Sequence, residues 1–162
     1  MDDIHIRPLT IEDGEIAASI FFDAVHRGTR EHYTLEQRQA WAGTTADSAG
    51  WRNRLVGMDG FVAEMGGCAV GFMTLDDAGY IDLAFVRPEV AGKGVGWRLY
   101  RTIERLAEER GATRLTAHAS KTARPFFERQ GWIVDRQQSV VRRNVELINF
   151  KMSKELAGHR KK

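Results

Sequence analysis

The chain has 162 residues, of which 43% are hydrophobic and 28% are charged, and its formal net charge is +2. This composition predicts one folded domain, residues 1–156, followed by a basic tail at residues 157–162. The small net charge argues against nucleic-acid binding, and no apolar run is long enough to cross a membrane. Because the single cysteine, Cys68, excludes an internal disulfide, we expect a cytoplasmic protein in which Cys68 is a small core residue.

The first half of the chain predicts one strand, three helices and a β-hairpin. Residues 4–8 alternate between apolar and polar side chains and end at a proline, as a short strand does. Polar residues with capping patterns open three helices: Thr10 with Asp13, Thr34 with Gln37, and Asp47. We expect residues 61–65 and 68–75 to form paired strands, because the Gly66-Gly67 pair between them is typical of a hairpin turn.

The second half of the chain alternates strands and helices before it ends in another hairpin. The predicted elements are a strand at 80–86, a helix at 97–110, a strand at 115–119, a helix at 124–130 and paired strands at 133–141 and 145–152. The order β-ααα-βββ-α-β-α-ββ predicts a mixed α/β sandwich.

A glycine-rich loop, Ala91-Gly92-Lys93-Gly94-Val95-Gly96, lies between a predicted strand and a predicted helix. Residues without a Cβ let the backbone approach a ligand, and the first N–H groups of a helix bind anions. The loop therefore predicts a diphosphate site, although an ordinary turn can also contain such glycines. A dinucleotide G-x-G-x-x-G motif does not fit, because Trp97 occupies its last position, and a P-loop needs Ser or Thr after Gly92-Lys93.

Two segments resemble the GNAT N-acetyltransferase superfamily. The family motif V-x-P followed by Q/R-x-x-G-x-G/A matches Val86, Pro88, Gly94 and Gly96, whereas Ala91 departs from its Gln/Arg position. The stretch 119–132, ASKTARPFFERQGW, is similar to the strand, short helix and Gly-aromatic pair that follow in the family. Further segments resemble the YafP-like bacterial branch: residues 32–34, 36–37, 40–41, 123–127 and 149–150.

The resemblance implies an α+β fold with helices on both faces of a mixed, mostly antiparallel sheet. It also implies an enzyme that transfers the acetyl group of acetyl-CoA to an amine. In this family the loop at 91–96 binds the coenzyme A diphosphate. The pantetheine arm pairs with the backbone of the preceding strand, here Ala84, Phe85 and Val86. The helix after Ser120 lies beside the adenosine end of coenzyme A, so we expect Ser120, Phe126 and Arg129 to border it.

Two side chains are candidates for the base that takes the amine proton. Asp82 belongs to the strand 80–86, and regular alternation places it on one face with Tyr80 and Ala84. It is otherwise a solvated carboxylate or the partner of an arginine. His118 on the next strand is the second candidate, since histidine can accept a proton near neutral pH. Its alternative is a sheet-face histidine bonded to the backbone.

The chain departs from the family at the usual proton donor. Many GNAT enzymes have a tyrosine four residues after an alanine, and counting from Ala123 reaches Phe127. Phenylalanine donates no proton, so either Tyr33 serves as the acid or the thiolate leaves unassisted. Tyr33 is also a candidate acceptor contact, together with His26 and Trp41.

Two other functions remain open from the sequence. The missing tyrosine fits an acyl-CoA-binding sensor without turnover, and the glycine loop fits a nucleotide-dependent enzyme despite its spacing. We expect no metal site, because the five histidines form no ligand-spaced cluster with Cys68 or carboxylates. The expected partners are acetyl-CoA and an amine of a small molecule or peptide, in a monomer or homodimer.

Overall fold

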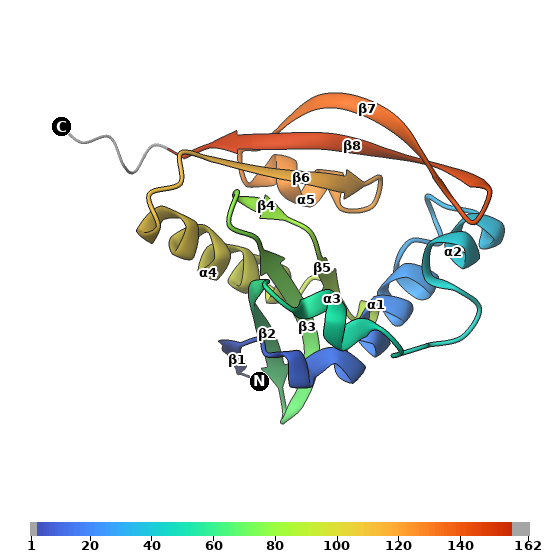
Figure 1. Cartoon of the computed structure of the whole chain (residues 1–162), viewed down its shortest axis with the longest axis horizontal. Helices are drawn as coiled ribbons and strands as arrows, with labels where there is room; N and C mark the ends of the chain where they lie inside the picture. Colours follow the sequence, from blue (N-terminus) through green and yellow to red (C-terminus); the bar gives the residue numbers. More distant parts are fainter. Residues whose placement is uncertain (1–2, 157–162) are drawn as a thin grey trace.

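The computed structural model describes residues 3–156, which contain eight strands and five α-helices (Figure 1). The strands are β1 (Ile4–Pro8), β2 (Asp59–Met65), β3 (Cys68–Leu75), β4 (Tyr80–Ile81), β5 (Ala84–Val86), β6 (Arg114–Ser120), β7 (Ile133–Arg142) and β8 (Val145–Glu155). The helices are α1 (Gly14–Gly28), α2 (Leu35–Ala42), α3 (Trp51–Leu55), α4 (Val95–Glu109) and α5 (Arg124–Arg129). The predicted basic tail at 157–162 lies outside the described residues.

Backbone hydrogen bonds divide the strands into two sheets of four. One sheet has the order β1-β2-β3-β5, and the other has the order β4-β6-β8-β7. Every pair is antiparallel except β4 with β6, which is parallel. The predicted mixed, mostly antiparallel fold is thus confirmed. The long β7–β8 hairpin covers the upper edge of the molecule in Figure 1.

The predicted strand 80–86 is interrupted at Asp82 and Leu83, and this break separates the two sheets. Thr74 of β3 satisfies the backbone that the break leaves open, because its Oγ1 accepts from Leu83 N at 3.1 Å and its own N–H donates to Leu83 O at 2.9 Å. The structure places Ile81 and Ala84 in the apolar cluster under α4, but Leu83 in the cluster under α1 and α3. The prediction that Ala84 shares a face with Asp82 is therefore wrong.

Helices cover both faces of the first sheet. Helix α4 packs on β2 and β3 through a buried stripe that includes Leu99 and Ile103, while α1 and α3 cover the opposite face. The capping boxes at Thr10 and Thr34 begin their segments as predicted. The cap predicted for the third helix is wrong, because α3 begins after Gly50 and the Asp47 carboxylate instead accepts from Ala49 N within a turn.

The hairpin predicted at Gly66-Gly67 joins β2 to β3, but the environment predicted for Cys68 is wrong. Cys68 is the first residue of β3, beside the hairpin turn, and is exposed rather than buried. No helix among residues 3–156 has the length and apolar character to cross a membrane.

Candidate active site

The glycine-rich loop lies at the N-terminus of α4. A short 3-10 turn, Pro88–Val90, leads into it from β5. Gly92 and Gly94 have φ angles of +81° and +88°, a left-handed conformation that favours glycine. No atom lies within 4 Å of the position that a Cβ would take at either residue, so the loop leaves open space on its outer side.

The backbone of this loop presents N–H groups to solvent. Ala91 N and Lys93 N donate to Pro88 O and Val90 O, but the structure records no protein acceptor for Gly94 N or Gly96 N among residues 3–156. Gly94 is the N-cap of α4 and contributes no side-chain cap. These free donors, with the positive end of the helix dipole, fit a diphosphate.

An opening between β5 and β6 begins where the two sheets separate. Tyr80 and Ile81 pair with β6, whereas the backbone of Leu83 and Arg87 bonds to β3. Since backbone groups of alternate strand residues point to opposite edges, those of Ala84 and Val86 face the opening. An extended arm can pair with this edge in the manner of an added strand.

A cavity of about 200 Å³ lies at the inner end of this opening. The three predicted catalytic side chains, Asp82, His118 and Tyr33, all line it although they come from three separate parts of the chain. Trp41 also lines it, as predicted, whereas His26 does not: its Nε2 lies 2.7 Å from Gly43 O.

The position of Asp82 agrees with both interpretations of this residue, as a catalytic base and as the partner of an arginine. Its carboxylate faces the cavity from the break between β4 and β5. Its Oδ2 lies 3.7 Å from Nη2 of Arg54, and the aspartate side chain is 24% exposed. The long distance leaves the carboxylate able to accept another hydrogen bond, so the pairing with Arg54 does not preclude a role as a base.

His118 lies on β6 with its ring 5.3 Å from the ring of Tyr80, centroid to centroid. Burial, and then the positive charge of Lys151, lower the pKa of His118, while the negative charge of Asp82 opposes this change. The lowered pKa favours the neutral imidazole at neutral pH, which is the form that can accept a proton.

The Tyr33 hydroxyl, at the end of the cavity, is hydrogen-bonded to two backbone groups. It donates to Ile148 O at 2.6 Å and accepts from Lys121 N at 2.9 Å. The side chain is buried, and burial raises its pKa above the usual value. Because the hydroxyl hydrogen is already bonded, the geometry favours a positioning role over proton donation.

The segment after β6, from Ser120 into helix α5, lies beside both the cavity and the glycine loop. Ser120 lines the cavity, and its Oγ accepts from Ala123 N at 3.0 Å. The Phe126 ring lies 3.5 Å from the position of a Cβ on Gly96, so α5 contacts the loop. Phe127 is buried against the ring of Trp132, so a hydroxyl at this position would lie in the core.

Sequence patterns gave no site role to several cavity residues. The polar ones are Arg54, Tyr80, Arg142 and Asn149, and the apolar ones are Phe21, Leu83, Val140, Leu147 and Ile148. Of these, sequence patterns pointed only to Tyr80, on the predicted face of Asp82, and Asn149, in a segment of the family branch, because the cavity forms only when α1, α3 and the β7–β8 hairpin meet. Among residues 3–156, no group of His, Cys, Asp and Glu is arranged to hold a metal ion.

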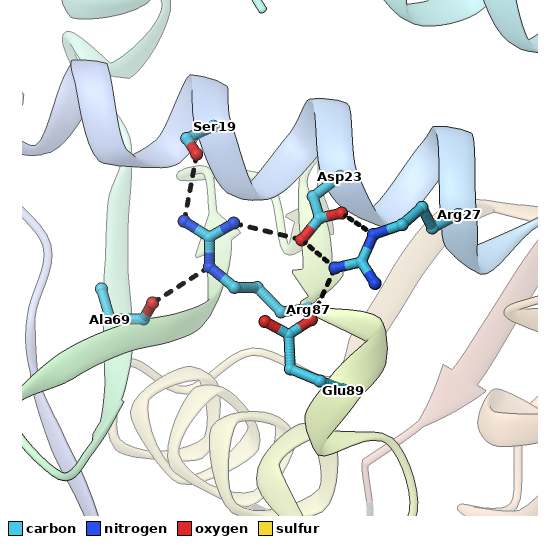
Figure 2. Close-up of polar contacts among 6 residues, drawn as sticks. All are labelled: Ser19, Asp23, Arg27, Ala69, Arg87 and Glu89. Atoms are coloured by element: carbon cyan, nitrogen blue, oxygen red, sulfur yellow. Dashed lines mark hydrogen bonds and ion pairs between the residues drawn. The ribbon is translucent and has the colours of Figure 1, made fainter.

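A partly buried arginine, Arg87, fixes the chain immediately before the loop (Figure 2). Arg87 Nη2 donates to Ser19 Oγ at 3.1 Å, Nη1 to Asp23 Oδ2 at 3.2 Å, and Nε to Ala69 O at 3.4 Å. Arg87 therefore connects the end of β5 to both α1 and β3, on the side of the loop that faces away from the opening.

Arg27 extends this network to the 3-10 turn. It pairs with Asp23 on its own helix and donates to Glu89 Oε1 at 2.7 Å (Figure 2). Arg27, and then Arg87, hold the pKa of Asp23 below its usual value. Helix α1 thus carries both Phe21, which lines the cavity, and the residues Ser19 and Asp23, which bind Arg87.

We expect Arg87→Met to lower the free energy of unfolding by about 2–4 kcal/mol, because Ser19, Asp23 and Ala69 O would together lose their donor in a mostly buried site. Arg27→Met is the control: Arg27 is half exposed, and its loss should cost much less. Urea unfolding followed by tryptophan fluorescence measures both. Equal losses in the two variants would contradict an anchoring role for Arg87.

Comparisons with known proteins identify the family. The model of the acetyltransferase (GNAT) domain matches residues 29–155. The uncharacterized N-acetyltransferase YafP of Escherichia coli (strain K12) is 35% identical over 152 residues, which are 94% of this chain and 96% of YafP.

Solved structures agree with this assignment. A GCN5-related N-acetyltransferase from Rhodopseudomonas palustris is 35% identical and superposes with a TM-score of 0.89, over 96% of this chain and 98% of that one. The PaiA N-acetyltransferase of Thermoplasma acidophilum, solved in complex with coenzyme A, shares the fold at 19% identity and a TM-score of 0.77, over 95% and 99% of the two chains. The chain belongs to the GNAT superfamily of N-acetyltransferases and is a YafP-like member of it.

Proposed function

We propose that the chain transfers the acetyl group of acetyl-CoA to the amine of a small molecule or peptide by direct attack in a ternary complex. The observation that carries this proposal is a cavity, lined by Asp82 and His118, that also contacts Phe85 on the strand leading into the glycine loop. Coenzyme A bound to PaiA of the same fold supports the choice of donor.

In this proposal the chain's own groups divide the work of binding and proton transfer. Gly94 N and Gly96 N bind the diphosphate, and the backbone of Ala84 and Val86 aligns the pantetheine arm. The backbone N–H of Ala84 also faces the opening and can stabilise the oxyanion that forms at the thioester carbonyl.

Asp82 or His118 takes the proton of the attacking amine, directly or through water. As the new C–N bond forms, the C–S bond breaks and coenzyme A leaves as a thiolate. A free thiol has a pKa of roughly 8.5, so this departure needs no tyrosine at position 127. Tyr33 holds the cavity wall together during the reaction.

Incubation of the chain with acetyl-CoA and a panel of amines tests the proposal, with thiol release and the mass of the acetylated amine as readouts. We expect both products in equal amounts. Coenzyme A binding without acetylation of any amine would instead favour a sensor domain. A cytoplasmic location and a monomeric or homodimeric state remain part of the proposal.

The helix after β6 gives a further prediction about the donor. Arg129 is exposed on α5, three residues after Phe126, which contacts the loop. We expect Arg129→Ala to weaken coenzyme A about tenfold and dephospho-CoA less, because only coenzyme A carries the 3′-phosphate. Isothermal titration with both ligands measures this difference.

Arg105→Ala is the control for general charge, since Arg105 is an exposed arginine on the outer side of α4. Equal weakening of the two ligands by Arg129→Ala would place Arg129 away from the 3′-phosphate.

A further inference from the structure

The acceptor side of the active site carries more positive than negative charge. The inner cavity is lined by Arg54, Arg142 and one carboxylate, that of Asp82. An adjoining outer cavity of about 590 Å³ shares Arg54 with it and adds Arg143 and Asp47. Three guanidinium groups therefore face two carboxylates across the region where an acceptor must bind.

These three arginines differ in the contacts that their guanidinium groups make within the protein. Arg54 approaches Asp82, and Arg143 Nη1 donates to Ala40 O at 2.7 Å. For Arg142, at the end of β7, the recorded side-chain bond is to Val141 O at 3.2 Å, and no ion pair is recorded for it among residues 3–156. Its guanidinium is therefore available to an anion from outside the protein.

The charges around His118 also indicate that this region favours an acceptor with an anionic group. Besides burial, the charges of Lys151, Arg136 and Arg142 lower its pKa, and Asp82 alone among its carboxylate neighbours opposes them. An ammonium group that enters this region without a negative charge of its own meets the same repulsion. A neighbouring anionic group on the same molecule would offset it.

Apolar side chains line another part of the inner wall. Phe21, Trp41 and Phe85 form an edge-to-face and tilted cluster with centroids 5.0 to 6.5 Å apart. Leu147 and Val140 of the β7–β8 hairpin complete this wall. Such a surface binds an apolar or aromatic body, with the charged groups of the cavity fixing its orientation.

We propose that the acceptor is an amine that also carries an anionic group, a carboxylate or a phosphate, and an apolar body. Arg142 binds the anionic group, the aromatic wall holds the apolar body, and the amine lies beside Asp82 and His118. This inference rests on the proposed acetyl transfer and adds the chemical class of the acceptor.

Matched amines test the inference. Each apolar amino acid is compared with its carboxamide, which lacks the negative charge, and with its aminophosphonate, which replaces the carboxylate. We expect kcat/KM to be at least about tenfold higher for an anionic member than for the carboxamide, since a charge-assisted hydrogen bond is roughly twice as strong as a neutral one and the difference corresponds to about tenfold in kcat/KM. The preferred anionic member tells a carboxylate site from a phosphate site.

Substitution of Arg142 tests whether this side chain causes the preference for anionic amines. Arg142→Gln should reduce the anionic preference about tenfold and leave coenzyme A affinity unchanged. Arg105→Gln is the control, because Arg105 is an exposed arginine on α4 that lines neither of these two cavities. It should keep the preference of the parent.

An equal or higher kcat/KM for the carboxamides would overturn the inference while leaving acetyl transfer intact. So would an anionic preference that survives in Arg142→Gln, or one that falls equally in both variants. If coenzyme A binds but no amine of any charge is acetylated, the proposed acetyl transfer fails, and the inference fails with it.

Discussion

Gly94→Val is expected to abolish measurable coenzyme A binding while the protein remains folded. At a φ of +88° a β-branched residue is strained by about 1–3 kcal/mol, but no neighbouring atom lies within 4 Å of its Cβ, so the fold can accept it. The new side chain would occupy the space in front of the N–H groups that the diphosphate must approach. We expect the Kd to rise on the order of a hundredfold or more.

Gly111→Val is the matched control for this substitution. Gly111 follows the other end of α4, has a φ of +79° and likewise has no atom within 4 Å of a Cβ. The control should lose comparable stability in urea and keep the coenzyme A affinity of the parent. If Gly94→Val binds coenzyme A as the parent does, the diphosphate does not bind at this loop.

Asp82→Asn is expected to lower the turnover number on the order of a hundredfold or more, with little change in coenzyme A affinity. The substitution keeps the shape of the side chain but removes the base, and general-base catalysis typically contributes about a hundredfold to ten-thousandfold. Steady-state kinetics with the acceptor at saturation measure it.

Arg54→Gln separates the base from the ion pair. It removes the partner of Asp82 but keeps the carboxylate, and a half-exposed pair at 3.7 Å contributes about 1 kcal/mol or less. Its turnover should therefore stay within about tenfold of the parent. An equal loss in both variants would show that Asp82 acts only through Arg54.

The pH–rate profile distinguishes the two candidate bases. The charge of Asp82 raises the pKa of His118, so Asp82→Asn lowers that pKa further. If His118 is the base, Asp82→Asn keeps near-parent turnover at neutral pH and its acid limb moves to lower pH. If Asp82 is the base, turnover falls and the acid limb of the parent is lost.

Local chemistry made much of the fold predictable. Capping boxes at Thr10 and Thr34 and the glycine pair at the β2–β3 hairpin act within a few residues of themselves. The glycine loop was equally readable, because a strand, positive-φ glycines and a helix N-terminus are contiguous in sequence. Catalytic candidates on β4 to β6 followed from the same local order.

The features that the sequence did not predict depend on contacts between residues that are distant in the chain. The break at Asp82 and Leu83 depends on Thr74, eight or nine residues away on another strand, which satisfies the freed backbone groups. Arg54 and Arg142 reach the cavity only because α3 and the β7–β8 hairpin converge on it. Cys68 is exposed because it lies beside a hairpin turn, where its apolar character alone does not determine burial.

The structure of the chain with a non-hydrolysable acetyl-CoA analogue tests this account most directly. The diphosphate should lie within hydrogen-bonding distance of Gly94 N and Gly96 N, the pantetheine arm along Ala84 and Val86, and the acetyl group at the cavity beside Asp82. An analogue bound elsewhere, or an acetyl group directed away from this cavity, would contradict it.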